Sequence, residues 1–189
     1  MIEKTLLENL YRQDKKSVSV IARDLKCSQS NINYWLLKYK IPKRTISEAI
    51  YLHSNPDGDP FNIKDPVTLD EAVLYGLGLG LYWGEGTKRN KYAVRLGNTD
   101  PKLILVFIKF LEKFYGINKD KLKFGIQVFS SMPARDVLKF WRKFLNVPPK
   151  QFYKVTVTSK RGSGTYKKKI EHGVLTVYFH NKKLRDIIC

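Results

Sequence analysis

The carboxylate that stands out as a candidate for chemistry is Glu85, which lies between Gly84 and Gly86 at the end of an apolar segment. A carboxylate is disfavoured at the C-terminus of a helix, where the macrodipole is negative, so this position indicates a cation nearby. Other acids have ordinary places, since Asp100 is suited to capping a helix and Asp136 to a first helical turn. The alternative is that Glu85 is a solvated side chain beyond a frayed helix, as most isolated carboxylates are.

The segment before this glutamate is expected to form a helix from Leu69, because Thr68 and Glu71 have the spacing of a capping box. Three glycines recur at every fourth position within it, so they fall on one face of the helix. Each interior glycine costs about 1 kcal/mol relative to alanine, and close contact with a second helix would offset that cost. We therefore expect a seam at which two copies of the chain pair through these glycines. They are Gly76, Gly80 and Gly84.

The composition indicates a nucleic acid as partner. The 189 residues include 35 Lys and Arg but 17 Asp and Glu, which gives a formal net charge of +18. Aromatic and polar residues are interleaved with this charge, which favours nucleic acid over a membrane surface. The glycines match neither G-x-x-x-x-G-K-S/T nor G-x-G-x-x-G, and two cysteines are too few for a disulfide framework. With no leader or membrane-spanning run recognised, we expect a cytoplasmic, nucleoid-associated protein without a membrane partner or a small-molecule cofactor.

Near the N-terminus, residues 17–40 indicate two short helices joined by a tight turn. The apolar faces consist of Ile21, Ala22 and Leu25 in the first helix and Ile32, Trp35 and Leu36 in the second. Ser28 is placed to cap the second helix, and Cys27 supplies an apolar side chain after the turn. This pattern resembles a helix-turn-helix, with Lys26 at the turn position where that family usually has glycine.

The exposed side of the second helix is expected to carry amides and hydroxyls, which suit base edges in a DNA major groove. The residues expected to reach bases are Ser28, Gln29, Ser30, Asn33 and Tyr34. Cations at the end of the helix and beyond it are expected to contact phosphates, which fixes register without reading sequence. They are Lys38, Lys40, Lys43 and Arg44. The alternative is a small three-helix bundle with a solvated polar face.

Turn-forming residues from Ser54 to Asp65 divide the chain into two domains. We expect an all-α helix-turn-helix domain over residues 1–52, a linker over 53–67 and a second domain over 68–189. In the second domain, apolar alternation predicts four strands, with helices between and after them. The predicted strands are 92–98, 121–129, 152–158 and 173–180. The chain is therefore expected to be α+β, and its second domain a helix-backed antiparallel sheet.

Alternation along these strands also predicts which side chains face the helices. The side chains expected to point inward include Tyr92, Val94, Leu96, Tyr153, Val155 and Val157. The opposite face is expected to be cationic and hydrogen-bonding, and a hydrophilic loop over residues 160–169 is expected to meet phosphate. The residues expected to bind DNA in this domain are Arg89, Lys91, Arg95, Lys123, Gln127, Thr156, Thr158, Lys160, Arg161, Lys167, Lys168 and Lys169.

The stretch G-L-G-L-Y-W-G-E-G, from Gly78 to Gly86, resembles the motif of LAGLIDADG homing endonucleases. The run R-L-G-N-T-D-P from Arg95 resembles the strand-to-helix junction of that family, and the resemblance covers most of residues 68–189. It implies an αββαββα domain. With one motif per chain, it also implies a homodimer whose motif helices pack at a twofold seam. The whole chain is similar to small bacterial proteins that join a helix-turn-helix to one such domain.

The resemblance also implies that Glu85 and the backbone carbonyl of Gly84 hold a divalent metal, Mg²⁺, which supplies the attacking hydroxide. The basic residue near the scissile phosphate would be Lys88, Lys150 or Lys154, among which the sequence does not choose. The chain is thus expected to bind specific sites in double-stranded DNA and to act as a homodimeric, Mg²⁺-dependent endonuclease. The alternative is a nuclease-inactive transcription regulator, because this fold also occurs without nuclease activity in regulators with a helix-turn-helix.

Overall fold

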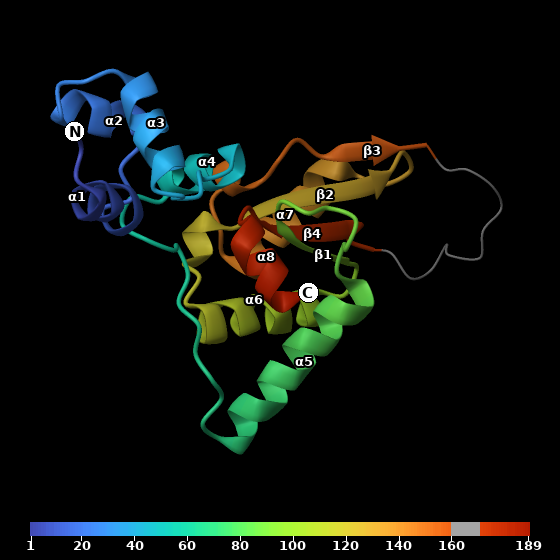
Figure 1. The fold of residues 1–189 in the computed structure, drawn as a ribbon. Coiled ribbons are helices and arrows are strands. Elements are labelled where there is room, and N and C mark those ends of the chain that lie inside the picture. Colours follow the sequence, from blue (N-terminus) through green and yellow to red (C-terminus); the bar gives the residue numbers. More distant parts are fainter. Residues whose placement is uncertain (160–170) are drawn as a thin grey trace. The chain divides into compact units, whose positions relative to one another are not determined.

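A computed structural model describes residues 1–159 and 171–189 of the chain (Figure 1). The chain folds as two units, Met1–Pro60 and Phe61–Cys189. The first unit consists of helices, and the second combines helices with a four-stranded sheet, so the chain is of the α+β class. No described helix has both the length and the apolar composition that crossing a membrane requires.

The first unit is built around one apolar cluster. Its elements are α1 (Lys4–Glu8), a π-helical turn (Asn9–Gln13), α2 (Val18–Asp24), α3 (Gln29–Lys38) and α4 (Ile46–Ser54). The buried cluster consists of Leu7, Tyr11, Ile21, Ala22, Ile32, Leu36 and Ile41. The apolar spacing of α2 and α3 therefore forms the core as predicted, although Leu25 and Trp35 are only partly buried. Helix α4 contributes no buried residue.

The turn between α2 and α3 depends on Lys26, whose backbone is left-handed with a φ of 50°. This conformation reverses the chain after α2, and the Cys27 N–H donates to the Ala22 carbonyl at 2.9 Å. Ser28 then caps α3, since its hydroxyl oxygen accepts a hydrogen bond from the Asn31 N–H at 3.1 Å. Glycine adopts a left-handed backbone without steric cost, which explains why helix-turn-helix sequences favour it at this position.

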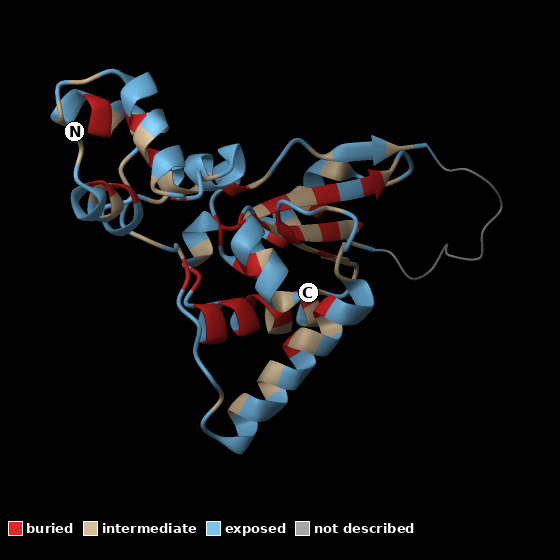
Figure 2. Ribbon diagram, viewed as in Figure 1, coloured by how far each residue is buried: buried red, intermediate tan, exposed pale blue. Residues whose placement is uncertain are grey.

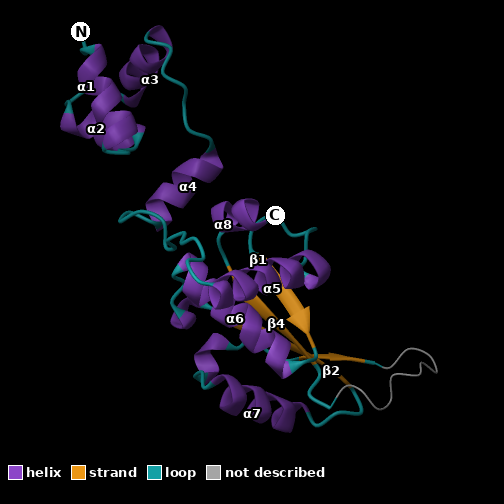
Figure 3. Ribbon diagram, turned by 90° about the horizontal axis from the view of Figure 1, so that it is seen from below, coloured by secondary structure: helices purple, strands orange, loops and turns teal. Residues whose placement is uncertain are grey.

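The second unit has a four-stranded sheet in the order β1-β4-β2-β3. Its elements are α5 (Leu69–Glu85), β1 (Val94–Asn98), α6 (Pro101–Tyr115), β2 (Lys123–Phe129), α7 (Ala134–Leu145), β3 (Thr156–Thr158), β4 (Val174–Phe179) and α8 (Lys182–Ile188), with 3-10 turns at Lys119–Lys121 and Pro149–Gln151. Helix α5 begins at the predicted residue, where the Thr68 hydroxyl accepts from the Glu71 N–H. The Glu71 carboxylate instead accepts from the Val67 N–H and pairs with Lys113. Figure 3 looks onto α5, α6 and α7, with strands behind them.

The sheet is mixed, so the prediction of an antiparallel sheet is wrong for one strand pair. β4 pairs antiparallel with β1 and β2, but β2 and β3 run parallel, with Gln127 beside Thr156. Helix α7 carries the chain back to the end of the sheet at which β2 begins, so β3 runs in the same direction as β2. The element order also differs from αββαββα, because α7 separates β2 from β3. Beside β1, the described residues add a single-residue bridge from Gly86 to Leu96.

Residues of α6, α7 and one face of the sheet form the core of the second unit (Figure 2). Its largest buried side chains are Tyr82, Phe107, Phe110, Phe114, Phe124 and Trp141. The Trp141 indole N–H donates to the His172 carbonyl at 2.7 Å, so this side chain is packed and also hydrogen-bonded. The strands are thus supported from one side, and the residues that alternate with the core face the other side of the sheet.

An extra residue ahead of β3 changes the face on which Tyr153 lies. Phe124 pairs with Phe152 and Gln127 with Thr156, so β2 advances three residues while its partner advances four. The additional residue breaks the alternation and turns Tyr153 away from the core, where the side chain is 44% exposed. The prediction that Tyr153 points inward is therefore wrong.

Of two further inward predictions, one is wrong and the other holds for the face of the sheet but not for burial. Tyr92 precedes the start of β1 and is 74% exposed. Val157 is beside Val128 in the register and so keeps the helix-facing side, but it is 55% exposed because β3 is an edge strand. Val94 and Leu96 of β1 are buried as predicted.

Candidate nucleic-acid interface

Helix α3 presents hydroxyl and amide side chains on the side away from its core. Ser28, Gln29, Ser30 and Tyr34 are exposed, and Asn33 is partly exposed. A hollow of about 740 Å³ lies beside the helix. Its lining consists of Ser30, Asn33, Tyr34, Leu36, Leu37, Lys40, Ile41, Pro42 and Lys43. Three of the five residues predicted to reach bases therefore line one hollow, together with Leu37, which no signal in the sequence indicated.

Positive charge surrounds α3 without an intervening carboxylate. Between Lys26 and Ser47 the chain has five Lys or Arg residues and no Asp or Glu. Lys43 is exposed beside the hollow. The Lys38 ammonium lies 4.8 Å from the centre of the Trp35 ring, a cation–π contact that holds it beside the helix. This stretch of the chain therefore offers cations to a phosphate and contributes no acid that would repel it.

Arg44 has a structural role that its sequence position did not reveal. Its guanidinium donates to the carbonyls of Lys15 at 2.8 Å and Lys16 at 2.7 Å, and it lies 4.1 Å from the centre of the Tyr11 ring. The Arg44 N–H also donates to the Tyr11 hydroxyl at 2.9 Å. These contacts tie the segment after α3 to the end of the first helix, so the guanidinium serves the fold.

The glycines of α5 fall into two sets. A Cβ added at Gly78 would lie 2.1 Å from Cγ of Phe110, so only glycine lets α5 approach α6 this closely. A Cβ added at Gly76, Gly80 or Gly84 would meet no atom within 4 Å. The three glycines predicted to form a seam therefore point away from the rest of the chain's described residues.

Large apolar side chains surround these outward glycines. At 100° per residue, four exposed apolar residues of α5 lie within about 60° of Gly80 around the helix, whereas Gly78 lies about 160° away. They are Leu69 (80% exposed), Val73 (54%), Leu77 (52%) and Trp83 (83%). Helix α5, with 17 residues, thus buries one face against α6 and exposes an apolar, glycine-lined face. We call this surface the glycine face.

Glu85 is exposed at the last position of α5, and no described cation lies within ion-pair distance of its carboxylate. The cation expected at this helix end is Lys88. Its ammonium donates to the Tyr82 carbonyl at 2.8 Å and to the Trp83 carbonyl, so it neutralises the negative end of the helix. Lys88 therefore lies near Glu85 in the chain, but its described bonds are to the backbone.

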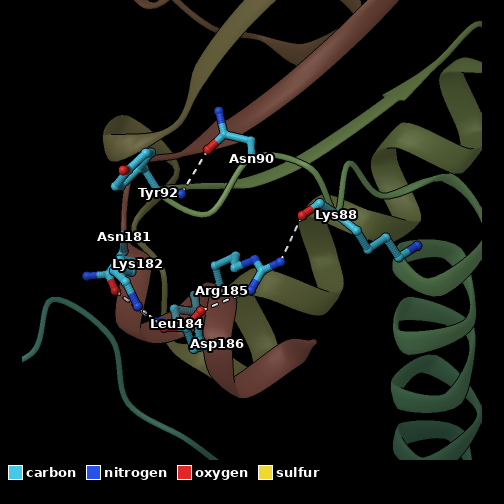
Figure 4. Close-up of polar contacts among 8 residues, drawn as sticks. All are labelled: Lys88, Asn90, Tyr92, Asn181, Lys182, Leu184, Arg185 and Asp186. Carbon is cyan, nitrogen blue, oxygen red and sulfur yellow. Dashed lines mark hydrogen bonds and ion pairs between the residues drawn. The ribbon is translucent and has the colours of Figure 1, made fainter.

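Helix α8 holds the loop that follows Glu85 (Figure 4). The Arg185 guanidinium donates to the Lys88 carbonyl at 2.9 Å and pairs with Asp186 at 3.0 Å. Lys182 pairs with the same carboxylate, and these two hydrogen bonds lower the pKa of Asp186 from its usual value. The side-chain oxygen of Asn181 caps α8 by accepting from the Leu184 N–H at 2.8 Å. The start of α8 is thus capped, and Arg185 of the same helix holds the backbone at Lys88. The loop that follows Glu85 therefore has a defined position.

The other two candidate lysines lie at the opposite edge of the sheet. The chain just after Glu85 borders β1 through the bridge at Gly86, whereas Lys150 and Lys154 precede β3. Four strand spacings of about 4.8 Å separate these two edges, which amounts to roughly 19 Å. Lys123 of β2 donates to the Lys150 carbonyl at 3.1 Å, which fixes that segment at the far edge. Within one chain, the structure does not bring Lys150 or Lys154 to Glu85.

The face of the sheet opposite the core carries a row of charge and aromatic rings. Arg95 of β1 and Lys123 of β2 flank Tyr178 of β4 in the register. The Arg95 guanidinium lies 4.7 Å from the centre of the Tyr178 ring and donates to its hydroxyl at 3.3 Å. A Cβ added at Gly125 would lie 3.0 Å from this ring, so glycine there leaves room for it. Arg95 and Lys123 thus lie on the predicted side of the sheet.

His180 joins this row through Tyr153. The Tyr153 hydroxyl lies 2.7 Å from Nε2 of His180, and the Tyr178 and His180 rings stack 5.9 Å apart. Burial lowers the pKa of His180 below its usual 6.5, and the charges of Arg95 and Lys123 lower it further. The imidazole is therefore neutral near pH 7. Tyr153 meets His180 because the extra residue before β3 turns Tyr153 onto this face. The alternation of apolar residues in the sequence did not predict this turn.

The remaining predicted DNA contacts have mixed surroundings. Gln127 and Thr156 are exposed and adjacent in the register, so their side chains share the face opposite the core. The Thr158 hydroxyl donates to the Val128 carbonyl at 3.2 Å. Arg89 and Lys91 are exposed in the loop after α5. The predictions for Lys160, Arg161, Lys167, Lys168 and Lys169 lie outside the described residues.

The described residues contain no group of three His, Cys, Asp or Glu side chains that could hold a metal ion. Mg²⁺ prefers six oxygen ligands and usually combines one or two carboxylates with water and substrate phosphates. One chain offers the exposed carboxylate of Glu85, preceded by the backbone of Gly84. These residues fit part of such a site, and a second carboxylate would come from a second copy of the chain.

Comparisons with protein families, with curated proteins and with solved structures find no match for this chain.

Proposed function

We propose that this protein binds specific sequences in double-stranded DNA and does so as a homodimer. The observation that carries the proposal is the outer side of α3, where uncharged polar side chains line a hollow and no carboxylate lies between Lys26 and Ser47. Amides and hydroxyls bond to base edges, and the cations around them attract phosphates. The net charge of +18 favours the same partner.

Helix α3 is the element that reads bases. The pair α2–α3, with its turn at Lys26, resembles a helix-turn-helix, in which the second helix enters the major groove. The side-chain amides of Gln29 and Asn33 are each suited to bonding with N6 and N7 of adenine. Lys43 is exposed at the hollow and would contact the backbone, which fixes the helix in register.

The sheet of the second unit supplies a second DNA-contacting surface. Arg95 and Lys123 contribute charge on the face opposite the core, and Gln127 and Thr156 contribute hydrogen-bonding groups. Cations on such a face suit phosphates, and hydrogen-bonding groups suit base edges. Arg89 and Lys91 in the loop after α5 extend the positive charge.

The glycine face of α5 supports the homodimer. A second copy of α5 is complementary to it, because outward glycines permit close approach and the exposed apolar side chains would pack around the seam. An exposed row of four large apolar residues on one helix is costly unless it is covered. One such helix per chain gives a closed twofold dimer.

Two substitutions in the first unit test the DNA-binding proposal. A preferred duplex is first selected from a random library, and binding is followed by fluorescence anisotropy. Asn33→Ala is expected to raise the Kd for that duplex by about 5- to 150-fold and to relax sequence preference, because one bidentate contact is lost. Lys43→Gln is expected to weaken binding to all duplexes alike and to reduce the salt dependence by about one unit of slope. If Asn33→Ala acts equally on all sequences, α3 does not read bases.

Endonuclease activity is the second candidate function, and the exposed Glu85 carries it. Glu85 is the last residue of α5, the helix that would meet its own copy in the dimer. Among the described residues its carboxylate has no ion-pair partner. A divalent cation there would neutralise the carboxylates of two copies and stabilise negative charge on a phosphate. Lys88 holds the end of α5 and Arg185 holds the loop, so the chain keeps Glu85 in place. Without cleavage, the same scaffold is a DNA-binding transcription regulator.

Cleavage of the selected duplex in the presence of magnesium distinguishes these two functions. The nuclease proposal predicts double-strand products that depend on Mg²⁺ and disappear in Glu85→Gln, with DNA affinity retained. Glu112→Gln is a matched control, because Glu112 is exposed on α6, away from the end of α5. Intact DNA with the unaltered protein supports the regulator.

A further inference from the structure

Leu37 lies on the outer side of α3, where a helix ordinarily presents a polar residue to water. Its side chain is 78% exposed. It follows Asn33 by four positions and Tyr34 by three, so these side chains are neighbours on one helix face, and Ser30 precedes them by about one turn. An isolated exposed leucine needs no explanation, but this leucine stands in the row of side chains aimed outward beside the hollow.

The hollow has an apolar lining and a positively charged edge. Leu36 and Ile41 line it and are buried, while Leu37 and Tyr34 line it and are exposed. Lys40 and Lys43 complete the lining from the segment after α3. Lys40 has a left-handed backbone with a φ of 55°, which turns the chain so that residues 40–43 return alongside the helix. The site thus combines apolar surface with two cations.

We propose that this hollow receives the C5-methyl group of thymine in the major groove, with Leu37 as the principal contact and Tyr34 beside it. The inference rests on the proposed binding of DNA by α3 and adds the base that the helix prefers. The thymine methyl is the one apolar group that base pairs present in the major groove, so it matches an exposed leucine on a helix placed there. Asn33, one turn before Leu37, then bonds to adenine of a neighbouring pair, and the helix reads an A·T-rich step.

The two lysines identify DNA, rather than an apolar helix of another protein, as the occupant. Lys40 and Lys43 lie at the edge of the hollow, where the phosphates of a duplex flank its groove. No carboxylate between Lys26 and Ser47 is present to pair with them. An apolar helix docked here would cover the Asn33 amide and both ammonium groups without satisfying them, which is unfavourable.

Replacing thymine by uracil tests the inference, because uracil lacks only the methyl group. The duplex selected from a random library is resynthesised with uracil at each thymine in turn, and Kd is measured for every version. The unaltered protein is expected to bind about fourfold more weakly at one or two positions, the loss expected for exposing one methyl-sized apolar group. Leu37→Ala is expected to bind the thymine duplex more weakly by a similar factor and to show no thymine-to-uracil difference at those positions.

Ile46→Ala is the matched control. Ile46 is 81% exposed on α4 of the same unit and does not line the hollow, so its variant is expected to keep the full thymine-to-uracil difference. Because Leu37 is exposed, Leu37→Ala is expected to keep the Tm of the unaltered protein, which thermal unfolding checks. Leu37→Gln, which keeps the length of the side chain and removes its apolar end, is a second variant expected to lose the difference.

The outcomes separate this inference from the function on which it rests. If uracil is tolerated at every position while Asn33→Ala still weakens binding, α3 reads DNA but the methyl contact is overturned. If Leu37→Ala keeps the thymine-to-uracil difference, Leu37 is not the contact. If no duplex is enriched and Asn33→Ala changes nothing, the proposed function itself fails.

Discussion

Gly78 and Gly80 lie two residues apart in α5 and have opposite surroundings. The space that a methyl group would have at each position shows the difference. A Cβ at Gly78 would overlap the Phe110 ring, whereas a Cβ at Gly80 would meet no atom within 4 Å. Gly78 therefore sets the distance between α5 and α6. Gly80 has no such constraint within the described chain, and the proposed homodimer would account for its lack of a side chain.

Substituting each glycine by alanine is expected to change the stability of the second unit in opposite directions. Gly78→Ala should lower the free energy of unfolding by about 1–3 kcal/mol, because the core must shift to accept the methyl group. Gly80→Ala should raise it by up to about 1 kcal/mol under conditions that keep the protein monomeric, because alanine favours the helix. Urea unfolding at low protein concentration measures both. Equal effects would show that Gly78 is not packed against Phe110.

The imidazole of His180 makes stability depend on pH in a defined direction. Its pKa in the folded protein is lowered by burial and by Arg95 and Lys123, so the unfolded chain takes up a proton at higher pH than the folded one. Stability should therefore be complete above the usual pKa of 6.5 and fall as the pH drops towards the lowered value. His180→Gln should flatten this part of the curve. The other two of the three histidines are present in both proteins, so identical pH curves would contradict the assignment.

At the residue scale, contacts between residues far apart in the chain could not be predicted from the sequence. The position of Glu85 predicted a cation near its carboxylate, which stays a prediction, because Lys88 donates to the carbonyls of Tyr82 and Trp83 instead. The role of Arg44 could not be predicted, because its partners Lys15 and Lys16 precede it by almost thirty positions. Tyr153 was misplaced for a different reason, since one extra residue reverses an alternation without leaving a compositional signal.

At the element scale, helices were predictable because their ends carry their own signals. Thr68 and Asp100 cap α5 and α6, and Gly116 closes α6 in the left-handed conformation. Strand direction has no comparable signal. An apolar alternation predicts a strand but not its neighbour, and the parallel pairing of β2 and β3 follows from the path of α7 over the core.

The glycine face of α5 is expected to be the surface through which two chains pair. Gly80→Leu should convert the proposed dimer to a monomer, because a leucine at the seam would hold two helices apart, while the monomer keeps its fold since the position is open. Sedimentation velocity over a range of concentrations measures the change. Lys109→Leu, which adds the same side chain to the exposed surface of α6, should leave the dimer intact. A dimer that survives Gly80→Leu would place the interface elsewhere.

At the scale of the whole molecule, charge is the property that both units share. The first unit surrounds α3 with cations, and the second places Arg95 and Lys123 on one face of its sheet. The excess of positive charge should make DNA affinity fall steeply with salt, whereas the polar side chains of α3 should make it depend on sequence. The composition of the chain predicts the dependence on salt, and the residue pattern of α3 predicts the dependence on sequence. Whether Glu85 cleaves is separate from both.

The most direct test of the central claim is the ratio of two dissociation constants, measured at one near-physiological salt concentration. One duplex carries the selected site and the other has the same base composition in scrambled order. Sequence-specific recognition predicts that the selected duplex binds at least about 1,000-fold more tightly. Equal affinity for the two duplexes, with the same salt dependence, would contradict the account and leave only non-specific attraction to a polyanion.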